Sequence, residues 1–328
     1  MRPIDAVIPW VDGNDPRHRA RLAQSAPEPL RAQEDVAAPT RYASLGEIFW
    51  CVASLNLYAP YIRKIFIVTD GQDPGLEPFL AAHFPDGYIP FEIVDHKTVF
   101  AGFEDLLPVF NSRSVESVLW RIPGLSEHFI ALNDDFLLTA PVPASHFFDD
   151  AGNPVIYARK RPTAWLRLLR ALKPRNDGRK NVSFKESMIT AADLLGGSPY
   201  ILRIEHTPRP LLKSRFQAFF AAHPDLLRAN IACRFRSHTQ FSPIEIQYLP
   251  LYQEGHCALR DPFRYLFYLK PKPKKDYVVR KMARLEGGDY CFCCFNSLDL
   301  ASDEDRERIR RWVEGRLFPQ LRRLARDR

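Results

Sequence analysis

The sequence of 328 residues has no long apolar run, few cysteines and little glycine. No stretch approaches the roughly 20 apolar residues that span a bilayer, and charge and proline come too early in MRPIDAVIPW for a signal peptide. Six cysteines in a chain of this length do not make a disulfide scaffold, so we expect reduced thiols. These features predict a cytoplasmic, globular protein.

The composition favours a large core and anionic partners. Residues of the AVILMFWYC set make up 46% of the chain, and the formal net charge is +7 with 28 prolines against 15 glycines. The basic residues concentrate at 159–185 and 306–328. A positive net charge is compatible with several anionic partners, namely nucleotides, phosphorylated glycans, lipid head groups and nucleic acid. It does not distinguish between them.

The first part of the chain alternates short apolar runs with a helical pattern. Strands are predicted at 6–11, 64–69, 91–94 and 128–132, and apolar spacing predicts a helix within 44–58. A further helix is predicted over 111–121. The strand, helix, strand order is typical of an α/β fold with a parallel sheet.

Acidic turns follow three of these strands. Asp12-Gly13-Asn14-Asp15 ends the first, Asp70-Gly71 the second and Asn133-Asp134-Asp135 the last. Carboxyl ends of parallel strands meet at one edge of a sheet, where ligands bind. Adjacent aspartates are costly together unless a cation or hydrogen-bond donors neutralise them. A divalent metal site is one interpretation, and plain solvated Asx turns are the other.

Four blocks of the sequence together resemble the Stealth family of hexose-1-phosphate transferases. They are IDAVIPWVDGNDP at 4–16, a long block at 41–138, a third at 205–252 containing EHTPRPLLK and FRSHTQFSP, and a fourth at 289–320 that begins DYCFCCFNS. They cover most of the chain in family order. The resemblance implies a Rossmann-like, GT-A-related nucleotide-sugar-binding core with an inserted helical segment.

The resemblance also implies transfer of a sugar 1-phosphate from a nucleotide-sugar, a UDP-sugar above all, to a glycan or lipid-linked glycan, with Mg²⁺ or Mn²⁺. Such a reaction builds negative charge on phosphoryl oxygens, which a cation and a guanidinium stabilise. In the fourth block the family reads Asn-Asp where this chain has Asn296-Ser297. The candidate residues are His206, Arg236 and Asp135 for catalysis, Asp134 and Asp135 for the metal, and Asp12, Gly13, Asp15, Arg41, Asn111, Arg113 and Asn296 for substrate. Asn111 is equally a helix N-cap.

We expect one catalytic domain over 1–328, with core parts at 1–150 and 231–328 and a basic helical insertion at 151–230. A buried strand is predicted at 290–295, although its cysteines leave a zinc site open. The C-terminal helix from Ser302 is basic and amphipathic, and either packs on the domain or touches a membrane. An ordinary glycosyltransferase and a nucleic-acid-binding protein are the competing functions, but no nucleic-acid recognition motif is present.

Overall fold

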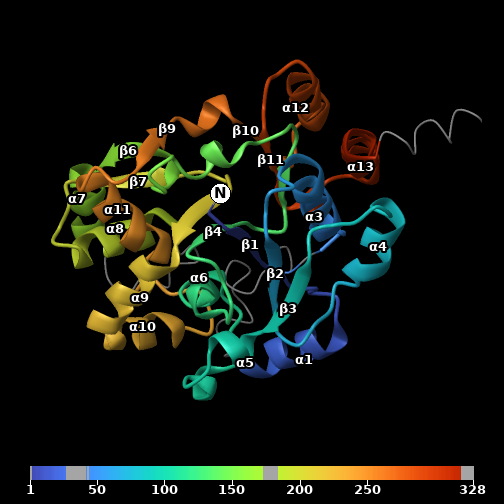
Figure 1. Ribbon diagram of the computed structural model, residues 1–328. Helices are drawn as coiled ribbons and strands as arrows, with labels where there is room; N and C mark the ends of the chain where they lie inside the picture. The colour runs from blue at the N-terminus through green and yellow to red at the C-terminus, as the bar shows by residue number, and fades with distance from the viewer. Residues whose placement is uncertain (1, 27–41, 43, 173–183, 319–328) are drawn as a thin grey trace, which may run out of the picture.

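The computed structural model describes residues 2–26, 42, 44–172 and 184–318. A five-stranded sheet in the order β3-β2-β1-β4-β8 runs through their centre (Figure 1). The first four of these strands are parallel, and β8 is antiparallel to β4. The strands are β1 (Ile4–Pro9), β2 (Lys64–Thr69), β3 (Phe91–Asp95), β4 (His128–Ala131) and β8 (Arg209–Leu212).

Both faces of this sheet are buried, because its strands are apolar on both sides. Successive side chains of a strand point to opposite faces. Accordingly, Ala6 and Ile8 pack into one hydrophobic cluster while Val7 packs into another, and Ile67 and Val68 of β2 divide in the same way. Parallel strands covered by helices on both sides have this near-continuous apolar sequence.

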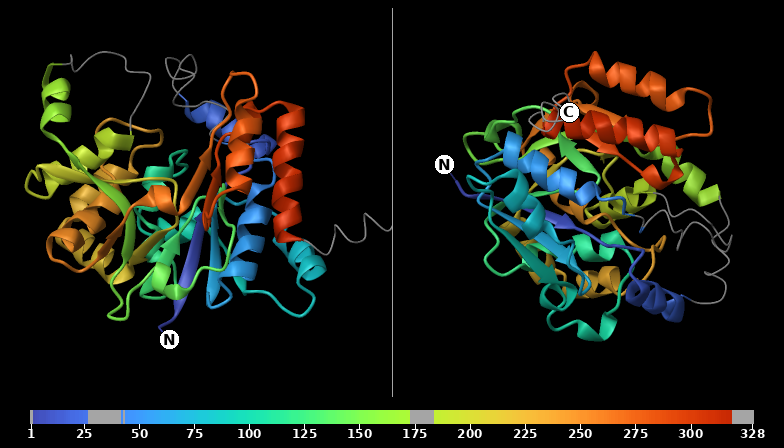
Figure 2. Two further views of the ribbon diagram at one scale, coloured as in Figure 1. Left: turned by 90° about the horizontal axis from the view of Figure 1, so that it is seen from above. Right: turned by 90° about the vertical axis from the view of Figure 1, so that its right-hand side faces the viewer.

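Helices cover both faces (Figure 2). One face carries α3 (Glu47–Tyr58) and α4 (Leu76–His83), and on the same side α12 (Tyr277–Glu286) and α13 (Asp303–Leu317) pack with α3 in a separate cluster. The other carries α5 (His96–Val99), α6 (Ser112–Glu116), α8 (Phe184–Leu194), α9 (Lys213–Ala222), α10 (Pro224–Ile231) and α11 (Pro243–Gln253). Helix α1 (Pro16–Ser25) follows β1 in the chain, and α7 (Ala164–Leu172) lies at the outside of the second group, bonded to α8 through Arg167 and Asp193.

Two small sheets extend the core. One has the order β10-β11-β5, with β10 (Leu266–Leu269), β11 (Phe292–Phe295) and β5 (Phe136–Leu138). The other has the order β7-β6-β9, with β6 (Val155–Pro162), β7 (Tyr200–Ile204) and β9 (Ala258–Arg260). Strand β5 begins immediately after the acids that follow β4, so the first small sheet is fixed against the edge where β4 ends.

The mixed α/β, Rossmann-like fold expected from the sequence is confirmed. The second strand has the predicted bounds, and the predicted buried strand at 290–295 is β11, whose four residues are all buried between β10 and β5. The helix expected within 44–58 is α3. All six cysteines are free thiols.

The single helix expected over 111–121 is wrong in extent. Helix α6 ends at Glu116, and a 3-10 turn at Leu119–Arg121 follows. The Ser117 hydroxyl donates to the Arg113 carbonyl at 2.7 Å, and such a bond from a serine side chain competes with continuation of the helix.

The segment 151–230, expected to be helical, contains β6, β7 and β8 beside its helices. The run Val155–Ala158 is buried throughout, which a strand achieves by packing on both faces. Strand β8 lies within 151–230 and yet joins the central sheet. The division of the chain at 150 and 230 stays a prediction.

No helix in the described part is long and apolar enough to cross a membrane.

Helix α13 begins as the sequence predicts and buries its apolar side. The Ser302 hydroxyl accepts from the Asp305 amide as an N-cap. Ile309, Val313 and Leu317 pack into a cluster with α12 and β11. Thus this helix packs on the domain as far as Leu317, and its expected continuation lies outside the described residues.

Candidate active site

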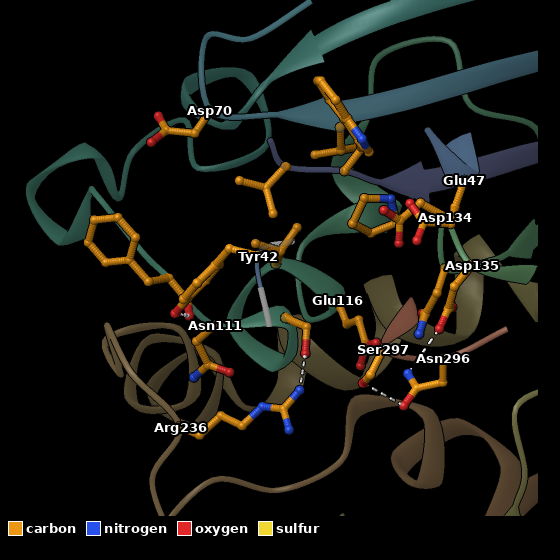
Figure 3. A pocket seen from close by; sticks show the side chains of 18 of the residues that line it. Tyr42, Glu47, Asp70, Asn111, Glu116, Asp134, Asp135, Arg236, Asn296 and Ser297 are labelled. Carbon is orange, nitrogen blue, oxygen red and sulfur yellow. Dashed lines mark hydrogen bonds between the residues drawn. The ribbon is translucent and has the colours of Figure 1, made fainter. Parts of the chain in front are cut away.

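A cavity of about 600 Å³ opens at the carboxyl ends of β1 and β4 (Figure 3). The chain visits β2 and β3 between these neighbouring strands, so they form the switch point at which open α/β sheets bind ligands. Its lining comes from distant parts of the chain, namely Trp10, Val11, His18, Tyr42, Glu47, Asp70, His96, Phe110, Asn111, Ser112, Glu116, Asn133, Asp134, Asp135, His206, Arg236, Tyr268, Lys270, Asn296 and Ser297 among others.

The acids after β4 are held by β11. The Asp135 carbonyl accepts from the Phe295 amide at 3.2 Å, and its Oδ2 accepts from Asn296 Nδ2 at 3.0 Å and from Cys294 Sγ at 3.5 Å. The other carboxylate oxygen, Oδ1, is buried and has no hydrogen-bond partner among the described residues. Of the two carboxylate oxygens of Asp135, Oδ2 therefore accepts hydrogen bonds from the protein and Oδ1 is available to a ligand or a cation.

Three carboxyl groups gather at this end of the cavity, where Figure 3 shows Glu47, Asp134 and Asp135 together. Burial raises the pKa of Asp134 well above its usual value, and the charges of Asp135 and Glu47 raise it further. Burial likewise raises the pKa of Glu47, with Asp135 adding to the effect. The negative charge of this group is uncompensated, so a cation would stabilise its ionised form.

His206 lies against aromatic rings beside the acids. Its imidazole is stacked on Tyr268 with ring centroids 4.6 Å apart, and Phe136 meets it edge-on at 6.2 Å. Burial lowers the pKa of His206, while the Asp135 charge opposes the shift. The neutral imidazole, which can accept a proton, is therefore favoured near pH 7.

Tyr268 links His206 to the acids through Asn296. The Tyr268 hydroxyl donates to Asn296 Oδ1 at 3.4 Å, and the Ser297 hydroxyl donates to the same oxygen at 3.1 Å. Ser297 has a φ of +56°, in the left-handed region. The turn after β11 thereby aims the Asn296 amide at Asp135.

Arg236 enters the cavity from the opposite side, next to Asn111 (Figure 3). Its Nη2 donates to the Ser112 hydroxyl at 3.2 Å. Asn111 is the N-cap of α6: its Oδ1 accepts from the Arg113 amide, and its Nδ2 donates to Gln240 Oε1 at 2.7 Å. Asn111 therefore acts as a helix N-cap, one of the two roles expected for it, and it also lines the cavity.

The predicted residues after β1 lie beside the cavity and not in its lining. Asp12 Oδ1 accepts from the Asn14 amide, which makes an Asx turn, and Asp15 caps α1 by accepting from the Arg17 amide at 2.8 Å. Gly13 donates to the Tyr42 carbonyl at 2.7 Å, and a Cβ there would lie 2.4 Å from that oxygen. These residues position Tyr42 and α1.

Arg113 belongs to α6, is buried and is also absent from the lining. Arg41 lies outside the described residues. The structure therefore brings together His206, Arg236, Asp134, Asp135, Asn111 and Asn296 in one cavity, and it leaves Asp12, Gly13, Asp15 and Arg113 around it.

Sequence reasoning missed the aromatic and histidine-lined end of the cavity. His18 packs between Tyr42 and Phe110, with ring centroids 5.3 and 5.5 Å away, and both of its buried ring nitrogens lack a hydrogen-bond partner among the described residues. Asp70 Oδ2 and His96 Nδ1 are also buried without a hydrogen-bond partner among the described residues. Buried polar atoms without a protein partner can form hydrogen bonds to a polar ligand that enters the cavity.

Burial lowers the pKa of both His18 and His96, with Asp70 opposing each shift. The sequence did predict that the acidic turn containing Asp70 meets the Asp134-Asp135 turn at one edge of the sheet, and both line the cavity. It gave no functional role to His18 or His96. Their position follows from strand order alone, since β3, β2 and β1 end at the same edge.

Arg209 of β8 is a further residue that sequence reasoning missed. It is buried, donates to Glu116 Oε1 at 2.9 Å and also donates to Asn133 Oδ1. Through these bonds it fixes the turn that carries Asp134 and Asp135.

Comparison with known proteins gives a consistent family match. Residues 2–26 match conserved region 1 and residues 41–156 match conserved region 2 of the Stealth proteins. An exopolysaccharide phosphotransferase of Streptomyces coelicolor is 31% identical over 308 residues, which is 93% of this chain and 53% of that protein. A capsular polysaccharide phosphotransferase of Streptococcus pneumoniae is 27% identical over 325 residues, which is 93% of this chain and 94% of that protein.

The chain thus spans about half the length of the exopolysaccharide relative, and nearly all of the capsular one. Among solved structures, an active-site mutant of LgtC is 13% identical, with a TM-score of 0.46 over 94% of this chain and 95% of that one. A likeness at that level carries no argument about function.

Proposed function

Because this chain belongs to the Stealth family, we propose that it is a hexose-1-phosphate transferase that moves a sugar 1-phosphate from a nucleotide-sugar to a hydroxyl of a glycan. The single observation that supports this most is the shared cavity, in which Asp134 and Asp135 lie with His206 and Arg236. The relatives named above are phosphotransferases of exopolysaccharide and capsule, and capsule or exopolysaccharide synthesis is the role we propose here.

The two ends of the cavity suit the two ends of a donor. Aromatic side chains and open polar atoms around His18, Tyr42 and Asp70 suit a nucleobase and ribose. Arg236 and the acids near His206 suit the diphosphate, because a guanidinium grips phosphate oxygens in a planar fork. We assign the nucleoside of a UDP-sugar to the first end and the sugar phosphate to the second.

In the proposed reaction the acceptor oxygen bonds to the phosphorus nearest the sugar. The bond from that phosphorus to the bridging oxygen breaks, and the nucleoside monophosphate leaves with the bonding electrons. His206, whose lowered pKa favours the neutral form, takes the hydroxyl proton, and Arg236 stabilises charge on the phosphoryl oxygens. The product is a phosphodiester between sugar and glycan.

The acid end fits Mg²⁺ or Mn²⁺. Asp135 Oδ1 is buried without a partner, and carboxylate oxygens are the ligands these ions prefer. In the described part of the chain no group of three His, Cys, Asp or Glu side chains is arranged to hold a metal. This agrees with binding through one or two carboxylates plus substrate phosphates. Asp134 and Asp135 would hold the ion, which would neutralise diphosphate charge.

The test measures release of nucleoside monophosphate from a panel of nucleotide-sugars. His206→Ala and Arg236→Ala should each lower kcat by at least about 100-fold while the melting temperature stays within a few degrees. His238→Ala and Arg234→Ala are matched controls, since both residues are exposed on the same segment. Wild-type rates for His206→Ala and Arg236→Ala would refute the assignment.

A further inference from the structure

Helix α7 holds two large apolar side chains out toward solvent. Trp165 is 66% exposed and Leu168 is 47% exposed. Residues three apart lie on the same face of a helix, so the two side chains form one apolar strip. Tryptophan is rarely left so exposed without a partner, since it buries more apolar area than almost any other side chain.

The outward orientation of this strip is fixed by contacts on the other side of α7. Arg167 donates to Asp193 Oδ1 through Nη2 at 2.6 Å and through Nε at 3.0 Å. Leu166 packs against the large hydrophobic cluster, and the buried Thr163 hydroxyl donates to the Ser198 carbonyl at 3.2 Å. Rotation of the helix that hid Trp165 would break these bonds, so its exposure is built into the fold.

Positive charge lies directly before the apolar strip. Strand β6 ends with exposed Lys160 and Arg161, whose side chains leave the strand on opposite faces, and only Thr163 separates the strand from α7. The Lys160 ammonium lies 3.9 Å from the centre of the Tyr200 ring. A shallow groove of about 360 Å³ beside them is lined by Ala158, Arg159, Lys160, Arg161, Leu259, Arg260 and Asp261. Its one acid, Asp261, is already paired with Arg159 at 2.6 Å. The groove therefore carries a net positive charge.

Helix α7 projects on the side of the molecule where the cavity opens. In the left view of Figure 2, β1 runs upward from the N-terminus to its carboxyl end, and α7 projects beyond the same edge at the upper left. The cavity opens at the carboxyl ends of β1 and β4. A flat surface resting on α7 would thus lie on the side of the sheet edge at which the cavity opens.

We propose that α7 is an interfacial helix that docks the protein on an anionic phospholipid surface. Trp165 and Leu168 enter the boundary between head groups and acyl chains, while Lys160 and Arg161 contact lipid phosphates. An apolar strip flanked by cations is complementary to that surface in both respects. The membrane contact considered for the C-terminal helix stays a separate prediction, and the docking proposed for α7 does not depend on the transferase reaction.

The experiment uses the full chain with vesicles of phosphatidylcholine alone or mixed with phosphatidylglycerol, read by co-sedimentation. The wild type should bind the anionic vesicles and bind them less in 0.5 M salt. The double variant Trp165→Ala/Leu168→Ala should bind at least about tenfold more weakly, because both apolar side chains leave the interface. Lys160→Glu/Arg161→Glu should lose at least about tenfold as well.

Leu57→Ala is the matched control, because Leu57 is 39% exposed near the end of α3, where the chain turns to enter β2 at the edge opposite the cavity, and it should bind like the wild type. Melting temperatures check that every variant is folded. Absence of wild-type binding, equal binding to both vesicle types, or an undiminished Trp165→Ala/Leu168→Ala variant would each overturn the proposal. Monophosphate release on a water-soluble acceptor should be unchanged in that variant, which separates this result from the catalytic assignment.

Discussion

Glu245 makes the stability of this protein depend on pH. It lies in the first turn of α11 and is 1% exposed. Its Oε1 accepts from the Leu202 amide at 2.8 Å, and its Oε2 is buried with no hydrogen-bond partner among the described residues. Burial raises the pKa of Glu245 to about 8, only partly offset by the bond from Leu202. The folded protein therefore keeps this carboxyl protonated at neutral pH.

The direction of the effect follows from the two pKa values. The unfolded chain releases the proton near pH 4.5, whereas the folded chain holds it to about pH 8. Between these values the folded state binds more protons, so the free energy of unfolding falls by about 1.4 kcal/mol for each pH unit. The loss over the whole window is about 5 kcal/mol as an upper limit, since structural relaxation reduces such effects.

Glu245→Gln should remove this dependence. The amide stays neutral, and its oxygen can accept the same bond from Leu202. We expect the variant and the wild type to melt within about 2 °C of each other at pH 5, and the variant to melt higher at pH 8.5, by up to about 7 °C. The assay is thermal melting from pH 5 to 9. Glu286→Gln, at an exposed glutamate, is the control. A difference between wild type and Glu245→Gln that does not grow with pH would refute the reasoning.

Three predictions concern the cavity, and each is measured as monophosphate release. Tyr268→Leu removes the ring stacked on His206 and should lower kcat about tenfold with little change in KM, whereas Tyr268→Phe keeps the ring and should stay within about threefold; equal loss in both would point to the hydroxyl instead. Asn296→Leu leaves Asp135 Oδ2 without its amide donor and should cost roughly 10-fold to 100-fold, and wild-type turnover would show that the 3.0 Å bond has no role. Chelation by EDTA should stop turnover and Mg²⁺ or Mn²⁺ should restore it, so a full rate in EDTA would exclude the metal.

The sequence predicted the central sheet well because its signals are local. The bounds of β2 follow from a β-branched run that Asp70-Gly71 ends, and both lie within eight residues. The position of Asp134 and Asp135 at the sheet edge could be predicted in the same way. A strand that is buried on both faces is apolar along its length, so polar residues come only after it ends. The gathering of His206 and Arg236 with these acids was predicted from family order, and they do line one cavity.

The rest depends on contacts between distant residues, which no local pattern encodes. Tyr268 meets His206 because β11 pairs with both β10 and β5 and so brings β10 into the sheet beside the end of β4, although β5 and β10 are more than a hundred residues apart. The strands of the segment 151–230 were not predicted, because β6 pairs with β7 and two helices lie between them in the chain. Asp12 was expected at the ligand, yet its side chain satisfies a nearby backbone amide first, as Asx residues in turns do.

The most direct measurement of the central claim follows one phosphorus atom. A UDP-sugar carrying ³²P in the phosphate nearest the sugar is incubated with the protein, a divalent cation and a glycan acceptor, and the products are separated. Our account predicts that the label passes to the glycan together with the sugar and that the released nucleotide is an unlabelled monophosphate. Label released in a nucleoside diphosphate would show attack at the anomeric carbon, and would contradict phosphoryl transfer.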